Sequence, residues 1–115
     1  MIVGAAGFIG SHITEKYINA GWNVIGIDGI MKGTGGDKYN LRHIRNKFTF
    51  IEKRIEDVKN LKDLIKSVKI IICCMGWTSH LDAILKPNYD IELNIKSHIH
   101  LMNSLNNSSN LKVIY

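Results

Sequence analysis

Short apolar runs alternate with amphipathic segments along the whole chain. The apolar runs, which suit buried strands, occupy residues 1–3, 22–28, 48–51, 70–75 and 111–115. Between them, apolar side chains recur every three or four residues, which predicts helices over 8–20, 58–68 and 87–106 and a weaker one near 40–47. This order predicts an α/β fold, a Rossmann-like doubly wound parallel sheet with helices on both faces and right-handed crossovers.

Punctuating residues set the ends of these helices. Gly21 is a natural stop for the first helix, Asp57 is a suitable N-cap for the second, and Pro87 suits the first turn of the third. A polar loop at 106–110 should end the third helix. Its expected core stripe, widened by Leu105, is the set that recurs at helical spacing: Ile91, Ile95, Ile99 and Met102.

The length of 115 residues suits one domain, with no internal repeat and no boundary within it. The first strand is short for a central strand, and Tyr115 falls inside the last one. We therefore expect residues 1–115 to form an incomplete N-terminal domain that is cut after about five strands.

Composition narrows the function classes. With 45% hydrophobic and 22% charged residues, the chain resembles an ordinary globular protein. Its net charge of +5 is spread thinly, without a dense basic run, so we expect no nucleic-acid partner. The absence of a long apolar segment and of a secretion signal predicts a cytoplasmic protein without membrane contact. Cys73 and Cys74 are read as small core residues, and no metal site is expected.

Candidate chemistry lies in the first turn, where glycines occur at positions 4, 7 and 10. Between a strand and a helix, such glycines permit a tight turn, close approach of a pyrophosphate and close packing of the helix on the sheet. The anion would then meet free N–H groups at the helix N-terminus. Gly4, Gly7 and Gly10 are therefore candidate cofactor-binding residues.

Asp28 ends the second predicted strand, 18 residues after Gly10. An acid about 20 residues beyond such a glycine motif accepts hydrogen bonds from the adenosine ribose of a dinucleotide. A carboxylate there would also repel a 2′-phosphate, which favours NAD over NADP. The alternative interpretation is a polar residue that merely ends a strand.

Residues 4–12, Gly-Ala-Ala-Gly-Phe-Ile-Gly-Ser-His, closely resemble the nucleotide-binding signature of the extended short-chain dehydrogenase/reductases. This family contains the NAD-dependent sugar-nucleotide epimerases and dehydratases. A weaker resemblance continues through Asp28, Gly33 and 40–41, then 50–57, and finally Pro87 and Asn94. Members run to roughly 300 residues, so the chain would cover about their N-terminal third, without the C-terminal substrate region.

The resemblance implies a role for several residues. Phe8 and Ile9 would offer backbone N–H groups to the pyrophosphate, and Asp28 with Gly29 would bind the ribose. Ile55 would lie near the adenine, Met75 and Gly76 would pass close to the cofactor, and Asn94 would brace the last helix near the site. The implied cofactor is NAD, the implied substrate is a nucleotide sugar, and the complete protein would be a homodimer.

The chain also departs from the family pattern. Arg54 stands where an Asp often contacts the adenine amine; it cannot accept a hydrogen bond, so it either stacks on the ring or is a surface residue. The family's catalytic Tyr-x-x-x-Lys pair lies downstream of the fifth strand, and no tyrosine here has a lysine four residues on. No catalytic residue is therefore assigned, and this part alone is expected to be inactive.

Three functions stay open at this stage. The first is the NAD-binding portion of a sugar-nucleotide epimerase or dehydratase. The second is an NAD(P)-binding sensor or inactive Rossmann module, and the third is a reductase of the same family that acts on a non-sugar carbonyl. His80 and Asp82 follow the fourth predicted strand, in what is read as a solvated loop.

Overall fold

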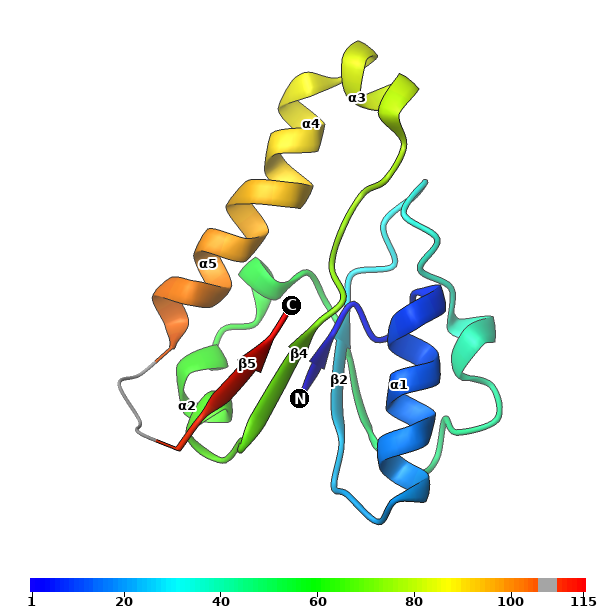
Figure 1. The fold of residues 1–115 in the computed structure, drawn as a ribbon, viewed down its shortest axis with the longest axis vertical. Coiled ribbons are helices and arrows are strands. Elements are labelled where there is room, and N and C mark those ends of the chain that lie inside the picture. Colours follow the sequence, from blue (N-terminus) through cyan, green and yellow to red (C-terminus); the bar gives the residue numbers. More distant parts are fainter. Residues whose placement is uncertain (106–109) are drawn as a thin grey trace.

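A computed structural model describes residues 1–105 and 110–115. Five parallel strands form one sheet in the order β3-β2-β1-β4-β5 (Figure 1). The strands are β1 (Ile2–Val3), β2 (Ile25–Asp28), β3 (Thr49–Glu52), β4 (Ile70–Cys73) and β5 (Lys112–Ile114). The parallel α/β fold predicted from the alternating pattern is therefore confirmed.

The helical elements fill the crossovers between the strands. They are α1 (Phe8–Asn19), η1 (Lys38–Leu41), η2 (Ile55–Asp57), α2 (Leu61–Lys66), α3 (His80–Leu85), α4 (Pro87–Ile91), the π-helical segment η3 (Glu92–Lys96) and α5 (Ser97–Ser104). In Figure 1, α4, η3 and α5 run on as one long helix. None of the helices in the described ranges is long and apolar enough to cross a membrane.

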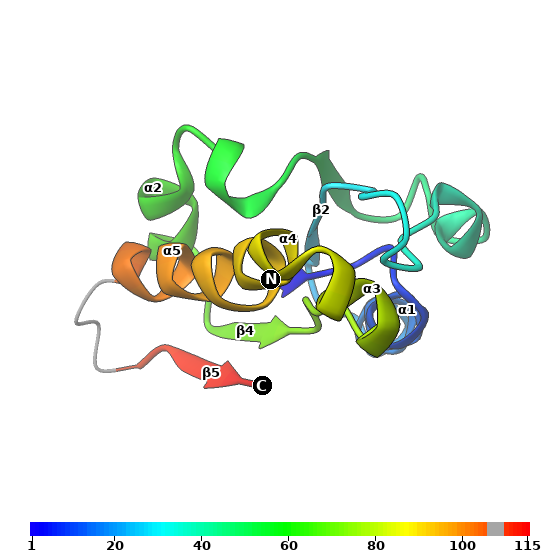
Figure 2. The same cartoon turned by 90° about the horizontal axis from the view of Figure 1, so that it is seen from above.

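Side chains on the two faces of the sheet form separate clusters. On one face, Val3, Ile27 and Ile71 pack with residues of α2 and α5, which lie on the same side of β4 and β5 (Figure 2). On the other face, Ile2, Val24 and Ile72 pack against α1. Helices therefore cover both faces, as predicted, because the buried strands alternate their side chains between the two layers.

The register brings the carboxyl ends of the central strands together. Val3 pairs with Ile27 on one side and with Cys73 on the other. Beyond these pairs, the Gly4 N–H donates to the Ile27 carbonyl at 2.8 Å. The turns that follow β1, β2 and β4 consequently meet at one edge, where open α/β sheets bind ligands.

Several element boundaries differ from the prediction. β2 begins at Ile25 rather than at residue 22, and Trp22 is exposed. Asp57 does not cap the second helix; it ends the short turn η2, and α2 begins only at Leu61. The loop predicted around His80 and Asp82 contains helix α3. The polar loop predicted at 106–110 lies, up to residue 109, outside the described residues.

The predicted core stripe of the last helix is wrong. Ile91, Ile95, Ile99 and Met102 are 41–52% exposed. The face that packs on the sheet instead carries Leu93, Ser97, Leu101 and Ser104, all of which are buried. The two serines can be buried because their hydroxyls are hydrogen-bonded. Ser104 donates to the His100 carbonyl of its own helix, and Ser97 donates to a carboxylate oxygen of Glu56. Apolar spacing alone therefore selected the outward face.

Candidate dinucleotide-binding site

The glycine turn between β1 and α1 is closely packed. Gly4 has φ +82°, a left-handed conformation that favours glycine. A Cβ atom on Gly4 would lie 2.7 Å from the carbonyl carbon and oxygen of Cys74. Gly4 therefore lets the chain leave β1 in a tight turn that passes directly over the end of β4.

Gly10 serves the packing of α1 on the same turn. A Cβ atom there would stand 2.0 Å from the Gly4 carbonyl oxygen and 2.8 Å from the Gly4 carbonyl carbon. Gly7 differs, because it has ordinary extended angles (φ −71°, ψ 172°) and its Cβ would come no closer than 3.4 Å to that oxygen. Packing within the protein thus requires glycine at positions 4 and 10. It does not require glycine at position 7.

Asp28 connects the end of β2 to the glycine turn. One carboxylate oxygen accepts a hydrogen bond from the Ala6 N–H at 2.9 Å, and the other accepts one from the Ile30 N–H at 2.8 Å. Gly36 packs against the same carboxylate, since its Cβ would lie 3.0 Å from an Asp28 oxygen. Each oxygen keeps a second lone pair, so the fixed carboxylate can still accept hydroxyl groups of a ligand.

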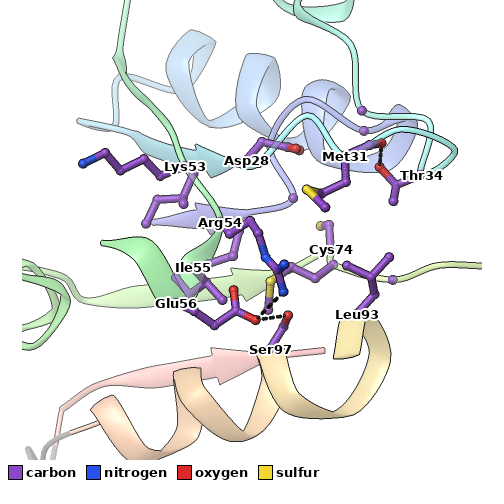
Figure 3. A pocket seen from close by; sticks show the side chains of 18 residues that line it. Asp28, Met31, Thr34, Lys53, Arg54, Ile55, Glu56, Cys74, Leu93 and Ser97 are labelled. Carbon is purple, nitrogen blue, oxygen red and sulfur yellow. Dashed lines mark hydrogen bonds and ion pairs between the residues drawn. The ribbon is translucent and has the colours of Figure 1, made fainter. Parts of the chain in front are cut away.

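These elements border a cleft that encloses about 590 Å³ of space, part of it open to solvent. Seven predicted site residues line it: Gly4, Gly7, Asp28, Gly29, Ile55, Met75 and Gly76. Figure 3 shows labelled lining side chains that come from the exits of β2, β3 and β4 and from the long helix.

The other four predicted residues lie beside the cleft lining. Gly10 lies behind Gly4, as described above. The side chains of Phe8 and Ile9 are largely exposed, and their backbone N–H groups lie in the first turn of α1, where the resemblance implies contact with a pyrophosphate. Asn94 lies in η3, at the loop that follows β4.

Asn94 holds that loop through its side chain. Its Oδ1 accepts from the Trp77 N–H at 2.6 Å, and its Nδ2 donates to the Trp77 carbonyl at 2.9 Å and to Asp90 Oδ1 at 2.7 Å. The Trp77 indole N–H in turn donates to the Gly33 carbonyl at 3.1 Å. Asn94 therefore joins the long helix to the loop after β4, and Trp77 continues the connection to the loop after β2.

A charged cluster closes the side of the cleft next to β3. Arg54 Nη1 lies 2.7 Å from a carboxylate oxygen of Glu92, and its Nη2 lies 3.2 Å from one of Glu56. The hydroxyl of Ser97 donates to the same Glu56 oxygen (Figure 3). Arg54 is thus a lining residue of the cleft, between the β3 exit and the long helix, and not a free surface residue.

The cluster shifts the titration of its members. The hydrogen bond to Glu92 is the main reason why the pKa of Arg54 is raised. Burial alone would raise the pKa of Glu56, but hydrogen bonds from Ser97 and Arg54 and the charge of Arg54 outweigh burial and lower that pKa. Glu56 and Arg54 are therefore both charged at neutral pH.

Other lining residues escaped the sequence analysis. They are Met31, Thr34, Gly36, Lys53, Glu56, Cys74, Leu93 and Ser97. Leu93 and Ser97 stand four residues apart on the buried face of the long helix, and recognition of that face would have found them. In the described ranges, no group of three or more His, Cys, Asp or Glu side chains is placed to hold a metal ion.

The fold is that of a Rossmann-like α/β domain, with a glycine turn under a helix N-terminus and a fixed carboxylate one strand away. The family model described as GDP-mannose 4,6 dehydratase matches residues 1–114. The chain belongs to this family, and the predicted membership among the NAD-dependent epimerases and dehydratases is confirmed.

Individual relatives agree with this assignment. UDP-glucose 4-epimerase of Mycolicibacterium smegmatis is 25% identical over the whole of this chain, which covers 37% of that protein. UDP-N-acetylglucosamine 4-epimerase of Methanobrevibacter ruminantium, solved with UDP-N-acetylmuramic acid, superposes with a TM-score of 0.84 and 26% identity. That match covers 99% of this chain and 36% of the other.

One more distant structure shares the fold. It is the dTDP-glucose 4,6-dehydratase DesIV of Streptomyces venezuelae, a double mutant solved with NAD bound, at a TM-score of 0.78 and 22% identity. The match covers 90% of this chain and 34% of that one. The chain thus spans about a third of the length of the relatives it matches.

Proposed function

We propose that the chain is the NAD-binding portion of a sugar-nucleotide epimerase or dehydratase. One observation carries the proposal: Gly7, the glycine turn and the Asp28 carboxylate face the same cleft, at the edge of the sheet where β1, β2 and β4 end. A diphosphate fits at the start of α1, where backbone N–H groups are free, and a ribose fits beside Asp28.

Each residue has a separate part in this proposal. Gly4 and Gly10 keep the turn close to the sheet, and Gly7 leaves room in front of the helix for the diphosphate. Phe8 and Ile9 donate backbone N–H groups to the diphosphate, and Asp28 with Gly29 takes the adenosine ribose. Ile55 forms an apolar wall for the base, Met75 and Gly76 border the path toward the nicotinamide, and Asn94 fixes the loop after β4.

The chemistry of the whole enzyme would use the dinucleotide to accept and return a hydride. In this proposal, residues outside 1–115 supply the binding region for the nucleotide-sugar substrate and the acid/base Tyr-x-x-x-Lys pair. Residues 1–115 alone are therefore expected to be inactive. A Tyr-x-x-x-Lys pair among the residues outside 1–115 supports the enzyme over a sensor. The substrate region would separate a sugar nucleotide from another carbonyl compound.

Two further parts of the proposal concern the protein's surroundings. The exposed apolar stripe of Ile91, Ile95, Ile99 and Met102 supports a homodimer of the complete protein, because a helix rarely leaves such a stripe in water. The thiols of Cys73 and Cys74 are unpaired, which supports a cytoplasmic location.

Calorimetric titration of the full-length protein with NAD and with NADP tests the cofactor assignment. We expect NAD to bind more tightly, because the Asp28 carboxylate would repel a 2′-phosphate. Asp28→Ala should narrow the difference between the two dissociation constants, whereas Asp82→Ala, outside the cleft lining, should leave it unchanged. A preference of the native protein for NADP would refute the role of Asp28.

A further inference from the structure

The side chain of Arg54 is confined by its neighbours before any ligand is considered. A Cβ atom on Gly29 would lie 2.9 Å from Arg54 Cγ and 3.3 Å from its backbone nitrogen. The stem of Arg54 therefore lies directly against Gly29, the residue that follows Asp28. Gly29 is small because Arg54 occupies the space beside it.

The guanidinium group is fixed by two carboxylates from different elements. Glu56 follows on the same chain segment, and Glu92 belongs to the long helix. The N–H donors of a guanidinium lie in its plane, so these contacts use its edges and leave its flat faces. Such a braced planar cation stacks well on an aromatic ring, at little cost in side-chain entropy.

The same end of the cleft offers no exposed acceptor on Glu56. One oxygen of Glu56 accepts from both Arg54 and Ser97, and the other is buried without a hydrogen-bond partner. Each Asp28 oxygen accepts one backbone N–H, and its second lone pair is assigned to the ribose in the proposed function. A nucleobase next to Ile55 would therefore meet an apolar wall and a planar cation.

We propose that Arg54 is the platform on which the base of the dinucleotide stacks, and that the site selects the base by its flat face rather than by its exocyclic amine. This inference rests on the proposed NAD-binding function. The site should therefore accept a dinucleotide in which hypoxanthine replaces adenine. Hypoxanthine carries an oxygen in place of the adenine amine and presents the same flat face.

Calorimetry on the full-length protein with NAD and with nicotinamide hypoxanthine dinucleotide tests this directly. We expect the two dissociation constants to agree within about threefold, since stacking tolerates different bases. A hydrogen bond from the amine to a carboxylate would instead favour NAD by about tenfold or more. That result would overturn the inference and indicate that Glu56 accepts a hydrogen bond from the adenine amine.

Variants provide a second measurement. Arg54→Met keeps the length of the stem and removes the planar cation, so both dinucleotides should bind about fivefold more weakly, with their ratio unchanged. Arg45→Met, at an exposed arginine outside the cleft lining, is the matched control and should leave both affinities unchanged. Unchanged binding by a folded Arg54→Met protein would also overturn the inference.

The outcomes separate this inference from the proposed function. If the native protein binds neither dinucleotide, the NAD-binding function fails and the inference fails with it. If NAD binds and the hypoxanthine analogue binds at least tenfold more weakly, the proposed function stands and only the role of Arg54 is refuted. The comparison on the native protein decides this even if Arg54→Met does not fold.

Discussion

Replacement of Gly10 by alanine should destabilise the domain although alanine is the better helix former. The added methyl carbon would stand 2.0 Å from the Gly4 carbonyl oxygen, whereas contacts below 3.0 Å are essentially never seen. The helix and the turn must therefore separate by at least 1.0 Å, the difference between these two distances. The contacted atoms belong to the Gly4 backbone, so no side-chain rotamer change can relieve the contact. The Gly4 N–H is also hydrogen-bonded to the Ile27 carbonyl, which holds the turn in place.

The size of the effect follows from two opposing contributions. Overpacking of this kind costs about 1–3 kcal/mol, and a contact with backbone belongs at the upper end. Alanine regains about 1 kcal/mol of helix propensity over glycine. The net loss should therefore be about 2 kcal/mol in the opening free energy of the β1–α1–β2 unit.

Hydrogen exchange followed by mass spectrometry, on peptides that cover residues 1–28 of the full-length protein, measures this loss. Exchange of the slowest amides should accelerate by roughly 30-fold in Gly10→Ala. Gly7→Ala is the matched control, because its methyl would meet no atom closer than 3.4 Å, and it should change the rates far less. Slower exchange in Gly10→Ala than in the native protein would refute the packing argument.

Two further predictions concern the charged cluster and the outer face of the long helix. Glu56→Gln should lower the free energy of unfolding at neutral pH. The difference from the native protein should shrink as the pH falls below 4.5 and through the lowered pKa of Glu56 in the folded state, because a protonated Glu56 no longer pairs with Arg54. Urea denaturation of both proteins at several pH values measures this difference; an equal difference at pH 7 and pH 3 would contradict the pairing. Ile99→Glu should convert the complete protein from dimer to monomer in sedimentation experiments. Lys96→Gln, which lowers the net charge by the same one unit at an exposed position of the same long helix, should keep it dimeric. A dimer that survives Ile99→Glu would exclude this face as the interface.

The order of elements was predictable because it depends on local apolar patterns. The run at Ile70–Cys73 is apolar on both faces, as a central parallel strand requires. The run at Ile25–Asp28 places Ile25 and Ile27 in the core on one face and ends in an acid. The glycine turn was predictable as well, since the spacing of Gly4, Gly7 and Gly10 reflects local geometry. The placement of Asp28 at the same edge follows from parallel register.

The parts that sequence reasoning missed depend on packing between distant segments. The outward face of the last helix carries isoleucines, while its inward face relies on Ser97 and Ser104, so the apolar pattern indicated the wrong side. The cluster of Arg54, Glu56 and Glu92 could not be predicted either. Arg54 and Glu92 are 38 residues apart in the sequence, and only the folded chain brings the β3 exit next to the long helix.

Titration of the full-length Gly7→Val protein with NAD tests the central claim most directly. Gly7 lines the cleft and has backbone angles that valine can adopt, so the fold should persist while the side chain fills the space in front of α1. We predict that the native protein binds NAD and that the folded variant, verified by hydrogen exchange, shows no detectable binding. An unchanged dissociation constant for NAD in the variant would contradict a diphosphate site at this turn.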